Sequence, residues 1–366
     1  MILSGLIVWP AVGWADDASN TTSNPQPASP ATASEQSSEA AIRAAAERIT
    51  AQQTRQAAAA STETTAPSST ASVTAAAAPA APPSEEKGPP LPLHSIEGVG
   101  GVGLTEMAYL VNPSTGDNWL GLPAASVTHV QAKYKNAEIF SVSETLFKRL
   151  ELSGSFDDVG LGDFDRTVKD KLGANLSSDW VQMYTVSARL ALLNEGELGQ
   201  SWLPAVTAGV HYKYNATINQ FNDDLGGALN KVVGVKDNQG EDFTLTATKM
   251  LKTALPRPVF VSGTVRETDA ADIGWLGFTH RYETVFEGNV GVFATDNLVL
   301  AAEYRQMPND LKQVPGVLGP ESDWWTIAAS YILSKHTNIS VAYANLGNML
   351  NHREPAALWV QFKYEF

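Results

Sequence analysis

The 366-residue sequence contains no cysteine, and only 17% of its residues are charged. The absence of cysteine excludes a disulfide framework and a cysteine-ligated metal. Beyond residue 93 the chain also lacks any apolar run of the length, about 20 residues, that a transmembrane helix needs. The formal net charge is -14, and so acidic a chain is poorly suited to nucleic acid. We therefore expect no nucleic-acid partner, no metal and no cofactor.

The N-terminal quarter of the chain is poor in large apolar side chains. Between residues 16 and 90 there is neither an aromatic residue nor a leucine, and Ala, Ser, Thr, Pro and Glu predominate. Such a segment cannot bury enough apolar surface to offset the entropy lost on ordering, so we expect residues 16–93 to form a disordered arm. Before it, the apolar residues 1–15 resemble a signal peptide that lacks its positively charged start. This pattern predicts export, with the arm in the periplasm.

The C-terminal residues alternate strictly between apolar and polar side chains. One face carries Leu358, Val360, Phe362, Tyr364 and Phe366, and the other carries Trp359, Gln361, Lys363 and Glu365. A period of two predicts a strand with one apolar and one wet face. In bacterial outer-membrane β-barrels, apolar side chains face lipid and polar ones face the lumen, and a strand that ends the chain on an aromatic residue is typical of them.

Segments of about ten residues, the length with which a tilted strand crosses a bilayer, recur through residues 123–366. We predict twelve strands, at residues 126–135, 137–146, 148–156, 181–193, 203–214, 241–251, 257–267, 283–294, 298–306, 322–333, 337–346 and 357–366. Apart from the first hairpin, long connections alternate with short ones. An outer-membrane barrel with both termini in the periplasm predicts this pattern, because its outer loops are long and its periplasmic turns are short. The predicted fold class is therefore all-β, a transmembrane up-and-down antiparallel β-barrel of about twelve strands.

Residues 94–122 precede the first clear strand and are apolar and glycine-rich, with few charges. Two arrangements fit this composition: the segment inserts into the barrel as a plug, or it packs at the periplasmic mouth. Within it, Gly98–Gly103 matches the dinucleotide-binding pattern G-x-G-x-x-G. That pattern holds a pyrophosphate only between a buried strand and a helix. Here it follows a proline-rich linker, so we expect no nucleotide site.

The polar faces of the predicted strands carry more cations than carboxylates. A cationic passage concentrates anions, which favours a passive channel for small hydrophilic solutes with mild anion preference. The alternative is a structural or scaffolding barrel, closed by residues 91–122 or filled by paired Arg and Glu, whose arm binds a periplasmic partner. The predicted pore-lining residues are Lys133, Arg149, Glu151, Arg189, His211, Lys213, Arg266, Glu287, Glu303, Arg305, Lys363 and Glu365, with His129 on the same face.

Two further groups of residues suggest chemistry without completing a site. The four aspartates within residues 157–165 offer oxygen ligands for Ca²⁺, but they lack the EF-hand spacing and its closing glutamate. An outer-membrane phospholipase uses a lipid-facing Ser and His, and the candidates here, Ser262 and His280, have no evident third partner. We therefore assign no catalytic and no metal-binding residue, and expect no enzyme.

Several motifs of residues 94–366 are those of a known family. They are His94-Ser-Ile-Glu-Gly-Val-Gly-Gly101, Ala108-Tyr-Leu-Val-Asn-Pro113, Glu144-Thr-Leu-Phe147, Leu203-Pro-Ala-Val-Thr-Ala-Gly-Val-His-Tyr-Lys-Tyr214, Gly277-Phe278 and Glu303-Tyr-Arg-Gln-Met-Pro308. With these motifs the chain resembles an uncharacterised family of bacterial outer-membrane proteins, domain of unknown function 3034. The resemblance implies an outer-membrane location, and with it outer-membrane lipid and lipopolysaccharide as partners. It implies no activity, cofactor or site residue.

Overall fold

The computed structural model describes residues 93–252 and 256–366. The expected signal peptide at residues 1–15 lies outside the described residues, and so does the expected arm except for its last residue, Leu93. Among the residues that the structure describes, no helix has both the length and the apolar character needed to cross a membrane.

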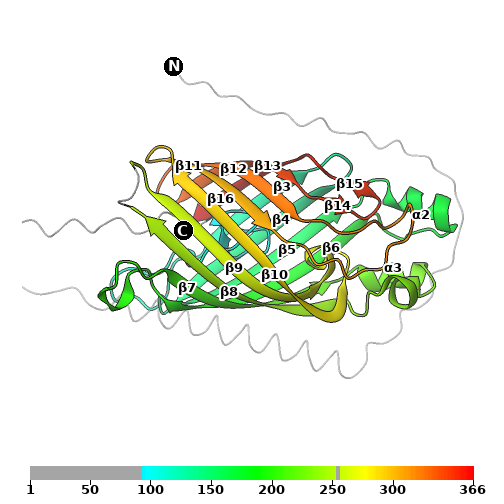
Figure 1. Cartoon of the computed structure of the whole chain (residues 1–366), viewed down its shortest axis with the longest axis horizontal. Helices are drawn as coiled ribbons and strands as arrows, with labels where there is room; N and C mark the ends of the chain where they lie inside the picture. The colour runs from blue at the N-terminus through cyan, green and yellow to red at the C-terminus, as the bar shows by residue number, and fades with distance from the viewer. Residues whose placement is uncertain (1–92, 253–255) are drawn as a thin grey trace, which may run out of the picture. The chain divides into compact units, whose positions relative to one another are not determined.

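Twelve antiparallel strands close into a barrel (Figure 1). Each strand pairs with its neighbours along the chain, and β16 pairs with β3 to complete the circle. The strands are β3 (Ala124–Gln131), β4 (Asn136–Leu146), β5 (Leu150–Gly160), β6 (Trp180–Leu193), β7 (Ala205–Asn215), β8 (Gln239–Leu251), β9 (Val259–Ala270), β10 (Phe278–Phe293), β11 (Leu298–Arg305), β12 (Trp324–Ile332), β13 (Thr337–Asn345) and β16 (Ala357–Glu365). Every predicted strand is present, so the predicted fold class is confirmed.

The connections at the two ends of the barrel differ in length. At one end, called the turn end below, short connections such as residues 147–149 and 333–336 join neighbouring strands. At the other, the loop end, residues 161–179, 216–238 and 306–323 form long loops, and the helices of the first two are seen at the right of Figure 1. The smaller elements are β1 (Leu93–His94), β2 (Gly100–Gly101), α2 (Phe164–Leu172), η1 (Glu197–Gly199), α3 (Ile218–Asp224), η2 (Leu229–Val233), η3 (Ala271–Gly274), β14 (Asn348–Met349) and β15 (His352–Arg353).

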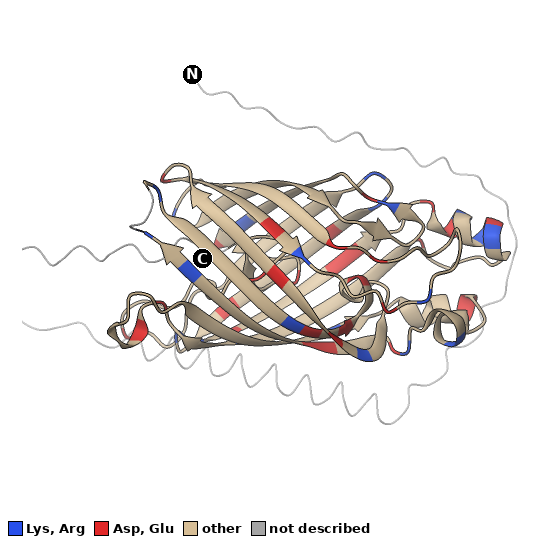
Figure 2. Ribbon diagram, viewed as in Figure 1, with Lys and Arg blue, Asp and Glu red and all other residues tan. Residues whose placement is uncertain are grey.

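The outer face of the barrel is apolar. Alternate side chains point outward along each strand, and large apolar ones there are strongly exposed, for example Val186 at 63%, Ile327 at 60% and Leu358 at 64%. Most of the strand length is uncharged, drawn in tan in Figure 2. In water such a surface would be a large aggregation hazard, whereas lipid solvates it. The closed strand ladder also satisfies the backbone groups that a bilayer cannot. The barrel is therefore a transmembrane one.

The lipid-facing surface gives a prediction with a matched control. Val186 lies at the middle of β6 and points outward, so Val186→Arg should destabilise the barrel in a bilayer by about 2–4 kcal/mol, the range for a cation at the bilayer midplane. Val232 is similarly exposed, at 55%, but lies in η2 of a long loop. Val232→Arg should change the free energy of unfolding little. Urea unfolding of both variants in lipid vesicles measures this, and equal losses would contradict a lipid-facing β6.

Candidate functional site

The inner wall of the barrel is lined by hydroxyl groups. Each strand from β3 to β9 contributes at least one buried Ser or Thr side chain to it. Hydroxyls of neighbouring strands bond to one another, as between Thr246 and Thr264 (2.9 Å) and between Thr248 and Ser262 (2.8 Å). The alternation that makes the outside apolar thus makes the inside polar.

Residues 93–111, called the plug segment below, are packed against this inner wall. Every residue of the segment is buried. It begins with the β1–β2 hairpin, in which Leu93 pairs with Gly101. His94 lies between two wall hydroxyls, with Nδ1 2.8 Å from Ser126 Oγ and Nε2 2.7 Å from Ser143 Oγ. The chain therefore fills its own lumen.

The glycines of the plug segment are required by close packing. A Cβ on Gly103 would lie 1.5 Å from a ring carbon of Trp359, and one on Gly101 would lie 2.3 Å from the carbonyl oxygen of Thr105. Gly98 has a φ of +79°, a conformation that side chains disfavour. The G-x-G-x-x-G pattern therefore serves tight packing inside the barrel. It does not lie between a buried strand and a helix, as a nucleotide site requires.

Two glutamates of the plug segment meet a group of cations on the wall. Glu97 contacts Nζ of Lys213 (2.5 Å), Nη2 of Arg266 (3.0 Å) and Nη1 of Arg305 (2.8 Å). All of these side chains are almost completely buried. Buried ions are tolerated only when they are paired and hydrogen-bonded, so Glu97 and its partners depend on one another.

Glu106 extends the same network. Its carboxylate lies 3.1 Å from Nε2 of His211, 3.0 Å from Nη2 of Arg266 and 3.5 Å from Nη1 of Arg189. We call Arg189, Lys213, Arg266 and Arg305 the cation cluster.

Three carboxylates of the wall complete the network around the cation cluster. Asp242 lies 2.7 Å from Lys213 and from Arg266, and Glu287 lies 2.6 Å from Arg266. Glu151 lies 3.2 Å from Arg189. Each cation of the cluster thus contacts carboxylates from the wall and from the plug segment.

The backbone of the plug segment is satisfied partly within the segment, as between the Ile96 N–H and the Gly103 carbonyl oxygen (2.7 Å), and partly by wall side chains. The Glu303 carboxylate accepts the backbone N–H groups of Leu104 (3.0 Å) and Thr105 (2.8 Å). The Arg189 guanidinium donates to the carbonyl oxygen of Gly100 (2.7 Å). Buried backbone groups need such partners, and here they come from the segment itself and from side chains of the wall.

The lumen is also closed from the loop end. The residues after β9 form η3 and turn into the mouth, where Lys213 donates to the carbonyl oxygen of Ile273 (3.0 Å). The Nε1–H of Trp275 donates to Asp157 (2.9 Å), and its ring packs against that of Trp324 with centroids 5.8 Å apart. From the sequence, residues 271–277 were expected to belong to the loop between two strands. The apolar run Ile273–Leu276 within this loop is the signal that could have indicated burial.

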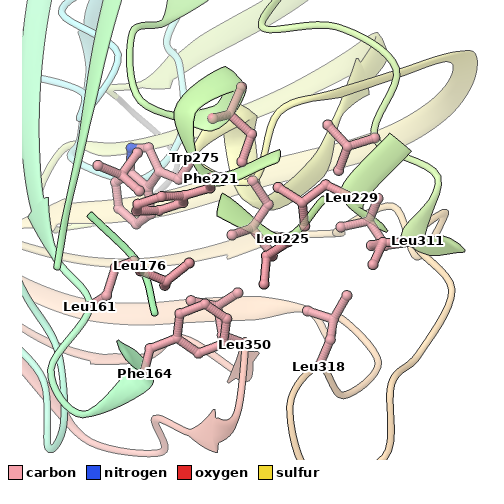
Figure 3. A pocket seen from close by; sticks show the side chains of 15 residues that line it. Leu161, Phe164, Leu176, Phe221, Leu225, Leu229, Trp275, Leu311, Leu318 and Leu350 are labelled. Carbon is pink, nitrogen blue, oxygen red and sulfur yellow. The ribbon is translucent and has the colours of Figure 1, made fainter. Parts of the chain in front are cut away.

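Above this closure the loop helices enclose a small apolar cavity of about 40 Å³. Figure 3 shows leucine and aromatic side chains of the long loops pointing toward one another around it. Helix α2 contributes Phe164, and α3 contributes Phe221. The apolar faces of these helices therefore pack together as a cap over the mouth.

Most of the predicted pore-lining residues point inward and are buried, and they are Glu151, Arg189, His211, Lys213, Arg266, Glu287, Glu303, Arg305, Lys363 and Glu365. Three predicted side chains do not. Lys133 is exposed in the loop after β3, and Arg149 lies at the turn-end rim beside Glu197 (2.5 Å). His129 faces outward, 2.5 Å from Glu138, because the even-numbered face of β3, with Ser126 and Thr128, is the one turned to the lumen.

Two inward carboxylates were missed. Asp242 shares the parity of Thr244 and Thr246 on β8, which is the signal that could have found it. Asp157 was assigned to an outer loop, but β5 continues to Gly160 and turns it inward.

The residues considered for other chemistry lie apart. Among residues 93–252 and 256–366, no three His, Asp or Glu side chains are arranged to hold a metal ion. Ser262 faces the lumen and bonds to Thr248, whereas His280 lies exposed beside Asp237 at 3.4 Å. They form no lipid-facing pair of the kind that a phospholipase uses.

These features define a class of protein, a transmembrane β-barrel of the outer-membrane type whose polar lumen holds a segment of its own chain. The chain belongs to the family described as Protein of unknown function (DUF3034), whose model matches residues 92–363. This confirms the resemblance that the motifs indicated.

No curated protein sequence matches the chain. Among solved structures it is similar to the KdgM porin, with 10% identity and a TM-score of 0.41 over 66% of this chain and 99% of that one. It is also similar to the NanC porin, with 8% identity and a TM-score of 0.40 over 67% and 98%. For the outer membrane protein Omp33 of Acinetobacter baumannii, the identity is 7% and the TM-score is 0.37, over 68% of this chain and 99% of that one. Likeness at this level carries no functional information.

The network around Glu97 gives the second prediction. Glu97→Gln removes a charge on which three buried cations depend, so the variant should lose about 3–5 kcal/mol of stability in this region. Amide hydrogen exchange within residues 93–111 should accelerate accordingly. Glu138→Gln is the control, because it breaks the half-exposed pair with His129, which contributes about 0–1 kcal/mol. Unchanged exchange in Glu97→Gln would show that the ion pairs do not hold the plug segment.

The loop-end closure gives a pH-dependent prediction. Burial raises the pKa of Asp272 in η3 from its ordinary 3.8 to about 7. The folded loop therefore disfavours the ionised form, and its stability should fall as pH rises from about 4, becoming lowest above about 7. Asp272→Asn should reduce this dependence, leaving the part due to Glu321, whose pKa burial also raises, and Asp165→Asn on the exposed side of α2 should leave it unchanged. Hydrogen exchange of residues 271–277, corrected for intrinsic rates, measures it. Protection independent of pH in the wild type would refute it.

Proposed function

We propose that this protein is an outer-membrane channel for small hydrophilic solutes and that the plug segment closes its lumen. The observation that carries the proposal is the chemistry of the inner wall, which presents hydroxyls and charges to whatever fills it. Buried ion pairs can often be replaced by packed apolar residues without loss of stability. Stability alone therefore does not account for a charged interior, whereas the passage of water and hydrated solutes does.

The way in which the plug segment is attached also supports gating. The barrel ladder is complete without it, since each of the twelve strands hydrogen-bonds to two neighbours. The plug segment is held mainly by side-chain contacts to the wall, such as those of Glu97 and Glu303. Its departure would cost these contacts but no strand pairing, and it would leave a polar passage behind.

The ionic preference of the open channel, for anions over cations, is inferred from the cation cluster. With the plug segment displaced, four cations remain in the network beside three wall carboxylates, Glu151, Asp242 and Glu287. This surplus would favour anions locally. It rests on the cluster alone. Over all the buried inward-facing wall residues named above, the five cations, which are the cluster and Lys363, meet six carboxylates, which are Glu151, Asp157, Asp242, Glu287, Glu303 and Glu365.

In the membrane, the turn end would face the periplasm. Short turns at the periplasmic side and long loops outside are the general pattern of outer-membrane barrels. Strand β16 finishes at the turn end, and the plug segment is continuous with residues 16–93, so both termini would be periplasmic.

The second candidate is a permanently closed structural barrel whose arm at residues 16–93 binds a periplasmic partner. The observation that favours it is closure at both ends, by the plug segment and by η3. The two candidates differ in whether the lumen ever conducts.

A reversible cross-link separates them. A Cβ placed on Gly98 would lie 3.1 Å from the Cβ of Ser155, slightly below the range of about 3.5–4.5 Å in disulfides, so a small backbone shift would complete the bond. The chain has no other cysteine. The full-length Gly98→Cys, Ser155→Cys variant should show no ion current in planar bilayers when oxidised. Reduction should restore openings to the frequency of the two single variants, which are the controls.

Openings that persist after complete oxidation would contradict a plug-gated channel. Silence of the wild type, the controls and the reduced variant alike would favour the structural barrel. Where current is seen, its reversal potential in a salt gradient tests the ionic preference, and cation selectivity would refute the role given to the cation cluster.

A further inference from the structure

Both glutamates of the plug segment contact the same guanidinium nitrogen. Glu97 Oε2 and Glu106 Oε1 each lie 3.0 Å from Nη2 of Arg266. These two oxygens are therefore at most about 6 Å apart, since both lie within the same contact radius of one atom. The two carboxyl groups of a short aliphatic dicarboxylate, such as succinate, are held at a similar separation.

We infer that the cation cluster is a binding site for short dicarboxylates, and that Glu97 and Glu106 occupy it as an internal mimic of the solute. The inference rests on the proposed channel function, because a solute reaches the cluster only after the plug segment has left it. It narrows the small hydrophilic solutes proposed above to one chemical class.

The site would remain formed after the plug segment leaves. Asp242 still contacts Lys213 and Arg266 at 2.7 Å, and Glu287 still contacts Arg266 at 2.6 Å and Arg305 at 3.3 Å. All of these side chains stand on barrel strands. The cations are therefore held in place by the wall, and a ligand would not have to order them, which is a large part of the cost of binding.

The two ends of the site differ in chemistry. Glu97 is surrounded by full positive charges, from Lys213 and Arg305 in addition to Arg266. Glu106 also meets neutral or switchable donors, with the Thr244 hydroxyl at 3.3 Å and His211 Nε2 at 3.1 Å. Once one carboxylate of a dicarboxylate is bound, the second is presented to its own donors at a high effective concentration. A monocarboxylate gains no such advantage.

The experiment uses the full chain with Glu97→Gln and Glu106→Gln together. This variant keeps the length of the plug segment but removes the charges that compete for the cluster, so it should conduct more often than the wild type. Succinate should block its current at a concentration at least tenfold below that of acetate, and the neutral diamide of succinate should not block it. Glu138→Gln, changed on the outer face, is the matched control and should behave as the wild type.

Calorimetric titration of succinate into the detergent-solubilised double variant is an independent measurement. Heat from succinate but not from acetate supports the site, and adding Arg305→Gln should weaken this binding at least tenfold. Where the double variant does not insert, Glu106→Gln alone is titrated, because it removes the competing charge at one end of the site.

The outcomes separate the two proposals. If the double variant conducts but acetate and succinate block its current equally, or if succinate gives no heat in the titration, the dicarboxylate site is wrong and the proposed channel function stands. If succinate binding gives heat but no variant conducts, the channel function is wrong and the dicarboxylate site stands.

Discussion

The interior of this barrel depends on one side chain, Arg266 on β9. Its guanidinium contacts four carboxylates, two from the plug segment and two from the wall, at 2.6 to 3.0 Å. A buried ion costs several kcal/mol in lost hydration, and only several well-placed partners offset it. The planar guanidinium offers five N–H donors in a fixed geometry, which lets one residue join the plug segment to both β8 and β10. A lysine at this position has three donors on one nitrogen and could not reach all four carboxylates.

Lys213 connects the two closures of the lumen. Its Nζ lies 2.5 Å from Glu97 of the plug segment and donates to the carbonyl oxygen of Ile273 in η3 at 3.0 Å. η3 holds strained backbone, with φ values of 41° at Asp272 and 59° at Ile273, and such strain persists only where surrounding contacts impose it. Nζ also lies 2.7 Å from Asp242, so loss of Glu97 from its place would leave Asp242 and the Ile273 carbonyl oxygen as its partners. The turn-end and loop-end closures are therefore coupled through a single ammonium group.

The strands could be predicted because a residue of a barrel wall has only two environments, lipid and lumen, and the side chains alternate between them. The same rule failed at two places. Both faces of β3 carry polar side chains, so the face with His129 was taken as the inner one although Ser126 and Thr128 face the lumen. Asp157 was left in a loop because the end predicted for β5 was four residues early.

The place of the plug segment could not be derived by any local rule, because its partners lie far along the chain, as with Glu97 and Arg305. One signal pointed to it. The only charged residues of positions 94–111 are the acids Glu97 and Glu106, while the lumen predicted for the following strands was rich in cations. Charge complementarity between a glycine-rich segment and a barrel wall is thus an argument for insertion that periodicity alone does not supply.

The attachment of the plug segment restricts the path by which it could leave. On its C-terminal side the chain is fixed to the turn-end rim, where Gly121 N–H donates to the Thr145 carbonyl oxygen at 2.8 Å and Leu120 bridges to Leu146. Between this anchor and the plug segment lies Asn112, with a φ of 42°, where the chain bends. The N-terminal side continues along the chain into the expected arm at residues 16–93. Tension on that arm would act first on the β1–β2 hairpin and then on Glu97. The plug segment would therefore unpeel from the turn end about a fixed rim, and the contacts of the cation cluster would break in the order Glu97 before Glu106.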